Sequence, residues 1–437
     1  MIVADAWRGN RFAVLGLARS GAATVHALIA GGARVVAWDS DAAKREALAD
    51  SLQEQSVDLD DLDLRFDPLD EMVGFDALVV SPGVPLNTHP LAAAAREAGV
   101  PVIGDIELFA QARRDLPPHK VVGITGTNGK STTTALVHHI LDTAGVPTLM
   151  GGNIGLPILG QDPLPEGGVY VLELSSYQID LTQTLDCDVA VLLNITPDHL
   201  DRYDGFAGYA ASKARLFAMQ SVPHLAIVDY RAEADEDVLD GAPADLPFQI
   251  IDGIEIGDQA GWPSLQGPHN ALNARAAAGV ARALGVSEVD IDRALVSFTG
   301  LPHRMEQIAS YDGVAYVNDS KATNPESTAP ALAAFARVHW IVGGRAKGDD
   351  LDACRPAFGH VVRAYTIGEA GPKFAEILAG SMPVENAGTL DAAVRSAVVH
   401  AQPGDTVLLS PACASFDQFT DYEARGAAFR AAVELLA

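Results

Sequence analysis

The sequence is poor in cysteine and has no long apolar run, and each shortage excludes a class of protein. Only 3 of its 437 residues are cysteines, and Cys187, Cys354 and Cys413 are too far apart to form a metal-binding motif. A secreted disulfide scaffold is therefore excluded, and we expect the protein to act in the reducing cytoplasm. No run of about 18 uncharged apolar residues occurs. We therefore expect no membrane span, and residues 1–12 do not resemble an export signal.

Basic residues are scarce as well. The chain has 30 lysines and arginines against 57 aspartates and glutamates, which gives a net charge of −27. We do not expect such an acidic protein to bind nucleic acid, and an anionic ligand must bind at local positive sites. The composition is otherwise that of a globular protein, with 48% hydrophobic residues. A chain of 437 residues is too long for one core, so we expect two or three domains. We also expect the protein to be a monomer.

The most informative stretch is residues 121–134, which read VVGITGTNGKSTTT. A short apolar strand is followed by a glycine-rich turn and then by a segment with helical spacing. In this arrangement backbone N–H groups face a phosphate, Lys130 adds a positive charge, and the Ser131 hydroxyl can bind a magnesium ion. The strict pattern has a glycine where Ile124 stands, so a chance glycine-rich turn is the alternative. We predict an ATP site formed by Gly126, Thr127, Asn128, Gly129, Lys130, Ser131 and Thr132.

The first hundred residues have the pattern of a Rossmann-like domain. A strand at 12–16 leads into GLARSG at 16–21, and a second strand at 34–38 is closed by Asp39. This pattern is close to a dinucleotide fingerprint, but Ala18 replaces the middle glycine. The residues alone leave NAD, another nucleotide or no ligand open. A third strand, at 77–80, ends in the rigid loop formed by Ser81, Pro82 and Gly83.

Two further strands carry polar residues at their carboxyl ends. Residues 169–174 and 189–193 are nearly all apolar, which predicts central strands of a parallel sheet. Ligands bind at the carboxyl ends of such strands. Glu173 therefore has the position of an acidic metal ligand beside the phosphate loop, and the alternative is a carboxylate at a helix start. His199 follows the second strand and is either a ligand or the cap of a loop.

A lysine lies on the apolar face of a predicted helix at 206–217. Lys213 shares one stripe with apolar and aromatic side chains, namely Phe206, Tyr209, Leu216 and Phe217. One interpretation is a lysine that buries its stem and extends its ammonium into solvent. The other is a desolvated lysine whose lowered pKa makes its amine reactive.

The last third of the chain again alternates strands and helices. Strands are predicted at 314–318, 338–342, 364–367 and 405–409. The loops 319–325, 343–348 and 410–416 follow strands and carry groups that suit carboxylate or phosphate. Linker-like stretches occur at 113–118 and 299–304.

These patterns predict an α/β protein of three domains. Residues 1–112 form a Rossmann-like N-terminal domain, and residues 113–300 form a central P-loop-type parallel-sheet ATPase domain. Residues 301–437 form a Rossmann-like C-terminal domain.

Several motifs together resemble the Mur ligase family of ATP-dependent amide-bond-forming enzymes. They are TGTNGKST, ELSSYQ, NITPDHLDRY, GPHNALNARAA and LPHRME, and the resemblance extends from Arg11 to the end of the chain. NDSKATNP at 318–325 and LLSPACASFDQF at 408–419 are similar to the glutamate-adding branch. The resemblance implies an ATP-dependent ligase that joins D-glutamate to UDP-N-acetylmuramoyl-L-alanine through an acyl phosphate, in peptidoglycan precursor synthesis.

The resemblance also implies that residues 1–112 bind the UDP-linked substrate and that residues 301–437 bind the amino acid. It further implies roles for individual residues. Lys130 holds the transferred phosphate, Ser131 and Glu173 bind one Mg²⁺, and His199 with a carbamylated Lys213 binds a second. Lys130, His199 and Lys213 are the implied catalytic residues. The implied adenine, phosphate and ribose contacts are Asn270, Asn273, Arg304 and Asp319. The implied UDP-substrate contacts are Arg19, Ser20, Asp39, Ser81, Pro82, Gly83, Asn153 and Ser175. The implied glutamate contacts are Thr323, Lys347, Ser415 and Tyr422, with Tyr422 where phenylalanine is frequent.

Two other classes of protein stay open at this point. A regulator that binds ATP without amide chemistry would not need Lys213 or the basic loops of the third domain. An NAD-dependent oxidoreductase would use the first domain, but the altered fingerprint and the ATP machinery count against it. Release of phosphate from ATP that requires both a UDP-linked substrate and an amino acid distinguishes the ligase from both.

Overall fold

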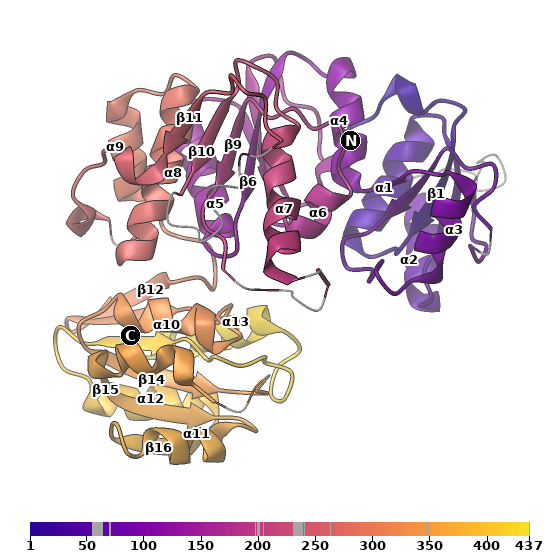
Figure 1. The fold of residues 1–437 in the computed structure, drawn as a ribbon. Helices are drawn as coiled ribbons and strands as arrows, with labels where there is room; N and C mark the ends of the chain where they lie inside the picture. Colours follow the sequence, from indigo (N-terminus) through magenta and orange to yellow (C-terminus); the bar gives the residue numbers. More distant parts are fainter. Residues whose placement is uncertain are drawn as a thin grey trace. The chain divides into compact units, whose positions relative to one another are not determined.

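The structure is a computed structural model that describes residues 1–54, 64–69, 71–196, 198, 202–203, 205–229, 239, 241–262, 264–346, 348 and 350–436 (Figure 1). The chain folds into two compact units. The first comprises Met1–Glu255 and Ala276–Ser287, and the second comprises Ile256–Arg275 and Glu288–Ala437. Within the described part of the chain, no helix has the length and apolarity that crossing a membrane requires.

The first sheet is parallel and has the strand order β3-β2-β1-β4-β5. Its strands are β1 (Arg11–Leu15), β2 (Arg34–Trp38), β3 (Leu64–Arg65), β4 (Ala77–Val80) and β5 (Val102–Ile103). Its helices are α1 (Arg19–Ala30), α2 (Ala42–Glu54), α3 (Pro90–Ala98) and α4 (Asp105–Ala112). The chain order reverses between β1 and β4, so the loops after these two strands lie side by side. This confirms the Rossmann-like prediction for the first domain.

The second sheet is also parallel, in the order β11-β10-β9-β6-β8-β7 (Figure 1). Its strands are β6 (His119–Thr125), β7 (Thr148–Gly152), β8 (Gly168–Glu173), β9 (Val189–Leu192), β10 (Leu225–Val228) and β11 (Phe248–Ile250). The helices that follow are α5 (Lys130–Thr143), α6 (Ser176–Asp180), α7 (Gly205–Ala218), α8 (Pro268–Ala283) and α9 (Glu288–Ser297). Strands β8 and β9 are buried along their whole length, as their continuous apolar sequences predict.

The third sheet belongs to the second unit and has the order β12-β13-β17-β14-β15-β16. Its strands are β12 (Glu306–Tyr311), β13 (Val314–Asn318), β14 (Val338–Gly343), β15 (Val361–Ile367), β16 (Val384–Gly388) and β17 (Thr406–Leu409). Its helices are α10 (Pro325–Ala333), α11 (Gly371–Leu378), α12 (Leu390–His400) and α13 (Tyr422–Glu434). Only β12 runs antiparallel to its neighbour among the described strands of this sheet, joined to β13 by a tight turn at Asp312 and Gly313. The three sheets confirm the predicted α/β class with three domains.

Helix α4 fastens the first domain to the central one within the first unit. The buried carboxylate of Glu107 accepts hydrogen bonds from the backbone N–H groups of Gln183 (2.7 Å) and Thr184 (2.9 Å) and from the Thr184 hydroxyl (2.8 Å). On the same helix, the Phe109 ring meets the Tyr170 ring edge-on at a centroid distance of 5.0 Å. The predicted boundary at residue 112 lies just beyond this joint, and the boundary positions stay predictions.

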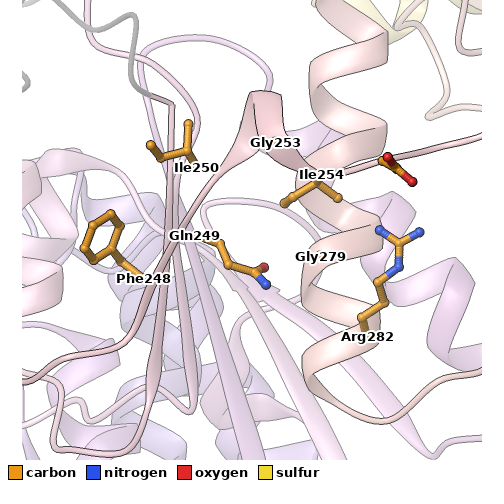
Figure 2. A pocket seen from close by; sticks show the side chains of 8 residues that line it. Phe248, Gln249, Ile250, Gly253, Ile254, Gly279 and Arg282 are labelled. Carbon is orange, nitrogen blue, oxygen red and sulfur yellow. The ribbon is translucent and has the colours of Figure 1, made fainter.

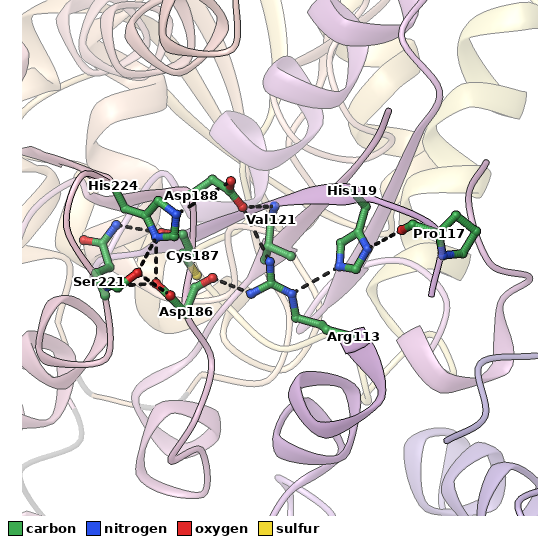
Figure 3. A network of polar contacts seen from close by, with 10 residues as sticks. Arg113, Pro117, His119, Val121, Asp186, Cys187, Asp188, Ser221 and His224 are labelled. Carbon is green, nitrogen blue, oxygen red and sulfur yellow. Dashed lines mark hydrogen bonds and ion pairs between the residues drawn. The ribbon is translucent and has the colours of Figure 1, made fainter. Parts of the chain in front are cut away.

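A network of polar contacts connects the segment after α4 to the amino ends of the central strands (Figure 3). The Arg113 guanidinium donates to His119 Nε2 at 3.1 Å and to the Asp186 carbonyl, and it lies 3.5 Å from Asp188 Oδ2. His224 Nδ1 lies 2.7 Å from Asp186 Oδ1. These groups lie at the amino ends of β6, β9 and β10, whereas the phosphate loop follows the carboxyl end of β6. The network therefore stabilises the end of the central sheet that lies opposite the phosphate loop.

Candidate active site

The phosphate loop has the geometry that its sequence predicts. Strand β6 ends at Thr125, and helix α5 begins at Lys130 after Gly129, which has a φ of 85°. Gly126 has a φ of 147°, and a Cβ atom there would lie 3.1 Å from the Leu193 side chain. Both glycines are therefore required by the backbone. The loop leaves the amino end of α5 open toward a phosphate.

Two lysines converge on one carbonyl oxygen of this loop. Lys130 Nζ donates to the Gly126 carbonyl at 2.9 Å and to the Thr127 carbonyl at 2.8 Å. Lys213 Nζ, from α7, donates to the same Gly126 carbonyl at 3.0 Å. Two ammonium groups that share an acceptor repel each other, so this end of the loop is suited to an anion that separates and neutralises them.

Lys213 is a desolvated lysine. Its side chain is only 1% exposed, so the interpretation of a lysine that extends into solvent is wrong. Its ammonium lies 4.6 Å from the centre of the Tyr209 ring. Burial, and then the charge of Lys130, lower the pKa of Lys213 from 10.5 to about 7, against the opposing effect of Asp198 and Asp180. A substantial fraction of this amine is therefore neutral near pH 7.

Glu173 presents an unsatisfied carboxylate oxygen beside the phosphate loop. Its side chain is 2% exposed, and Oε1 accepts a hydrogen bond from Asn153 Nδ2 at 2.8 Å, whereas Oε2 is buried and has no hydrogen-bond partner among the described residues. The helix after it is capped by Ser175 in a capping box with Gln178, so the interpretation of Glu173 as a helix-start carboxylate is wrong. A buried, unpartnered carboxylate oxygen fits a hard cation such as Mg²⁺.

The remaining predicted metal ligands are only partly described. Ser131 is buried and is the second residue of α5. His199 lies outside the described residues. Among the residues that are described, no group of three or more His, Cys, Asp or Glu side chains could hold a metal ion.

The loops of the first domain and the central domain enclose a pocket of about 290 Å³. Six of the predicted UDP-substrate contacts line this pocket, namely Arg19, Ser20, Ser81, Pro82, Gly83 and Asn153. Residues that were not among the predicted contacts, such as Gly152, Gly155 and Gln178, complete the lining. Because α1 begins at Arg19, its amino end faces this pocket and favours an anion.

Asp39 and Ser175 have other roles in the structure. Asp39 Oδ2 accepts a hydrogen bond from the Leu17 N–H at 2.8 Å and lies 3.3 Å from Lys44 Nζ, so it holds the loop after β1. Burial would raise the pKa of Asp39, but these bonds and the one from Asp41 N–H lower it below its usual value. Ser175 caps α6, and neither residue lines the pocket. Their contacts with a UDP-linked substrate stay predictions.

The predicted adenine contacts are buried neighbours on α8. Asn273 Nδ2 donates to Asn270 Oδ1 at 3.1 Å, and Asn270 Nδ2 donates to the Gln266 carbonyl at 3.0 Å. The predicted spacing of one helical turn is therefore confirmed. Their contact with adenine stays a prediction.

The third sheet presents three loops at the carboxyl ends of adjacent strands β13, β17 and β14. Asp319, in the first loop, accepts hydrogen bonds from Ser410 Oγ (2.7 Å) and from the Met305 N–H (3.2 Å). Burial raises the pKa of Asp319 to about 7. Tyr422 starts α13, and its ring lies 3.8 Å from Lys321 Nζ. The contacts predicted for Arg304, Thr323, Ser415 and Tyr422 stay predictions, and Lys347 lies outside the described residues.

Arg425, which sequence reasoning did not name, lies beneath these loops. It is 1% exposed and donates hydrogen bonds to Ser320 and to the Cys413 carbonyl. The sequence carried a signal for it, because Arg425 falls on one helical stripe with Phe429 and Val433. This is the same signal that identified Lys213.

A larger pocket, of about 410 Å³, lies elsewhere, between β11 and α8 (Figure 2). Phe248, Gln249 and Ile254 line it together with Arg282. It contains none of the predicted site residues.

Comparisons with known proteins agree with this arrangement. The Mur ligase middle-domain family model matches residues 124–246, and the model described as Mur ligase, glutamate ligase domain, matches residues 303–413. The model of the N-terminal domain of MurD-like Mur ligases matches residues 10–104.

Curated relatives match along the whole chain. The UDP-N-acetylmuramoylalanine–D-glutamate ligase of Novosphingobium aromaticivorans is 62% identical over 100% of this chain and 97% of its own length. The enzyme of the same name from Sphingopyxis alaskensis is 59% identical, over 100% of both chains.

Among solved structures, the UDP-N-acetylmuramate-alanine ligase MurC of Thermotoga maritima has a TM-score of 0.58 at 16% identity and covers 98% of this chain and 100% of its own. MurF of Acinetobacter baumannii has a TM-score of 0.58 at 21% identity and covers 97% and 91%. These two likenesses concern the fold. The relatives of high identity, together with the three matching domain models, show that the chain belongs to the Mur ligase family.

Proposed function

We propose that the protein is an ATP-dependent ligase that adds D-glutamate to UDP-N-acetylmuramoyl-L-alanine in peptidoglycan precursor synthesis. The high identity to relatives that bear this name, over the full chain, supports the assignment. The observation that carries the chemistry is the pair of lysines on the Gly126 carbonyl, next to the unpartnered carboxylate oxygen of Glu173. This arrangement is suited to a polyphosphate with its magnesium ion.

The reaction requires activation because a carboxylate is a poor electrophile. A carboxylate oxygen of the UDP-linked substrate attacks the γ-phosphorus of ATP, and ADP leaves. The amine of D-glutamate then attacks the carbonyl carbon of the acyl phosphate. The tetrahedral intermediate collapses with loss of inorganic phosphate, and the nitrogen loses a proton to give the amide.

The glycine loop and Lys130 hold the polyphosphate in this scheme. The loop consists of Gly126, Thr127, Asn128, Gly129, Ser131 and Thr132, and Lys130 neutralises charge on the transferred phosphoryl group. The N–H groups of Thr127 and Asn128 donate to Asn194 and so hold the loop in shape, whereas the N–H groups at the start of α5 serve the phosphate. Ser131 and Glu173 would hold one Mg²⁺, which when bound stabilises negative charge on the phosphate oxygens. His199 and a carbamylated Lys213 would serve a second.

Carbamylation of Lys213 explains why a lysine lies at a cation site. A neutral amine adds to carbon dioxide and loses one proton, which converts a potential ammonium into an anionic oxygen ligand. The burial of Lys213 and its pKa of about 7 supply the neutral amine. Activity should therefore fall in buffer depleted of carbon dioxide and recover with bicarbonate. Lys213→Arg should be nearly inactive, and a fully active arginine variant would refute the carbamate.

The other substrate positions follow the pocket and the loops. The UDP-linked substrate binds in the pocket lined by Arg19, Ser20, Ser81, Pro82, Gly83 and Asn153. Asp39 and Ser175, outside the lining of this pocket, are proposed as further contacts. Adenine binds at Asn270 and Asn273, and Arg304 and Asp319 serve phosphate and ribose. Glutamate binds at Thr323, Lys347, Ser415 and Tyr422. The protein acts as a cytoplasmic monomer, with domains at 1–112, 113–300 and 301–437.

Substrate dependence of phosphate release tests this function. Purified protein with ATP, Mg²⁺, UDP-N-acetylmuramoyl-L-alanine and D-glutamate should release phosphate and form the amide in equal amounts. L-Glutamate, D-aspartate and L-alanine serve as matched controls in the same assay. Phosphate release that does not depend on any amino acid, or a clear preference for another amino acid, would contradict the proposal.

A further inference from the structure

The first two turns of α13 pack against the loops that follow β13, β17 and β14 in the third domain. Arg425 projects from this helix into the interior and is 1% exposed. Its Nε donates to Ser320 Oγ at 2.9 Å, its Nη2 donates to the Ser320 carbonyl at 2.8 Å, and its Nη1 donates to the Cys413 carbonyl at 3.0 Å. One guanidinium thus ties the loop after β13 to the loop after β17.

The third loop, after β14, packs against the same group. Gly344 has a φ of 131°, and a Cβ atom there would lie 3.2 Å from Arg425 Nη1 and would collide with the Ala414 carbonyl. The next residue, Arg345, exchanges backbone hydrogen bonds with Ala414 at 2.9 and 3.0 Å. The guanidinium therefore lies at the point where all three loops meet.

Arg425 is a buried charge without a counter-ion in direct contact. Its hydrogen bonds end on two carbonyls and a hydroxyl, and no ion pair joins it to a carboxylate in the part of the chain that the structure describes. Burial lowers the pKa of Arg425 to about 10, so the group keeps its charge at neutral pH. An apolar residue of similar volume would avoid the cost of desolvating such a charge. A cation at this position is therefore better explained by function than by stability.

We propose that Arg425 is a positioning residue for the amino-acid substrate, which fixes the loops at 319–325 and 410–416 in one geometry and places a positive charge beneath them. This inference rests on the proposed function, in which those loops receive the two carboxylates of glutamate. Arg425 does not touch the substrate, because the loops cover it. It acts through the backbone of Ser320 and Cys413, which set the directions of the neighbouring side chains.

Kinetic constants of two matched variants test the inference. Arg425→Met removes the charge and the hydrogen bonds, and Arg425→Lys keeps the charge but cannot bridge three acceptors. We expect Arg425→Met to raise the KM for D-glutamate by about a hundredfold and Arg425→Lys by about tenfold, since charge-assisted hydrogen bonds are strong. The KM values for ATP and the UDP-linked substrate should stay within about twofold. A merely structural arginine would instead change all three KM values together and show no difference between lysine and methionine.

Controls keep the test decisive. Arg395, an exposed arginine on α12, is the matched position, and Arg395→Met should leave all constants unchanged. If Arg425→Met does not fold, Ser320→Ala decides, because it keeps the guanidinium but removes one of its acceptors. Ser320→Ala should then raise the glutamate KM selectively by about fivefold. Folded variants with a wild-type KM for glutamate would overturn the inference. Wild-type protein without glutamate-dependent phosphate release would refute the proposed function instead.

Discussion

Replacement of Lys213 by methionine should make the protein more stable while abolishing its activity. Lys213 is almost fully buried, its ammonium donates a hydrogen bond to the Gly126 carbonyl, and the ammonium of Lys130 donates to the same oxygen. Methionine has a similar length and no charge, so it fills the same volume without the cost of burying an ammonium. The lysine is therefore a residue whose presence destabilises the fold.

The size of the effect follows from the pKa of Lys213. Its ordinary value of 10.5 falls to about 7 in the folded protein. Below pH 7 both the folded and the unfolded chain carry the charge, and the penalty is complete at about 5 kcal/mol. As the pH rises from 7 toward 10.5, the folded chain has lost the proton while the unfolded chain still binds it. The wild type therefore gains stability over this range, and the penalty falls to about 2 kcal/mol at pH 9.

Urea unfolding at pH 6 and pH 9, in buffer free of carbon dioxide, measures this difference. The advantage of Lys213→Met over the wild type should be larger at pH 6 than at pH 9. Lys120→Met, at an exposed lysine on β6, should change stability by less than about 0.5 kcal/mol at either pH. An advantage that is independent of pH, or a loss of stability at pH 6, would refute the account of a desolvated amine.

Three other substitutions test the phosphate loop, the metal position and the packing of α13. Lys130→Ala removes a charge aimed at the transferred phosphoryl group, worth about 3 kcal/mol, and should lower kcat at least about a hundredfold in a steady-state assay while circular dichroism stays unchanged. Glu173→Gln removes the anionic oxygen at the metal position and should raise the Mg²⁺ concentration for half-maximal activity by at least about tenfold, with unchanged Mg²⁺ dependence as the contrary result. Gly426→Ala places a Cβ atom against the His303 ring and should cost about 1–3 kcal/mol in thermal unfolding, and an unchanged melting temperature would contradict it.

The sequence predicted the phosphate loop and Lys213 because their signals are local. The loop is one strand, one turn and one helix start, and Lys213 stands out against the apolar stripe of its own helix. Arg425 gave the same stripe signal, but its acceptor Ser320 lies 105 residues away in the chain. No local pattern reveals such a partner. The stripe on α13 could therefore have pointed to a buried cation, but it was not used to predict Arg425, and it does not show what the guanidinium holds.

Strand order and polar strands were harder to predict than buried strands. Strands β8 and β9 are buried throughout, so their apolar runs marked them clearly. Strand β12 is an edge strand of mixed exposure, and its sequence EQIASY has no long apolar run. Its antiparallel pairing with β13 depends on the turn at Asp312 and Gly313. The pocket between the first and central domains is formed by tertiary packing. The sequence therefore predicted the loops that line it, but not that these loops together enclose one pocket.

The hydrogen bonds of Glu107 determine where the first domain can be exchanged between related ligases. Its carboxylate and the N–H groups of Gln183 and Thr184 come from opposite sides of the predicted boundary at residue 112. A chimera cut at that boundary would pair the helix of one parent with the loop of another. The match to the N-terminal family model ends at residue 104, immediately before α4. A chimera cut there inherits the carboxylate and its donors from the same parent, so the hydrogen bonds between α4 and the central domain are kept.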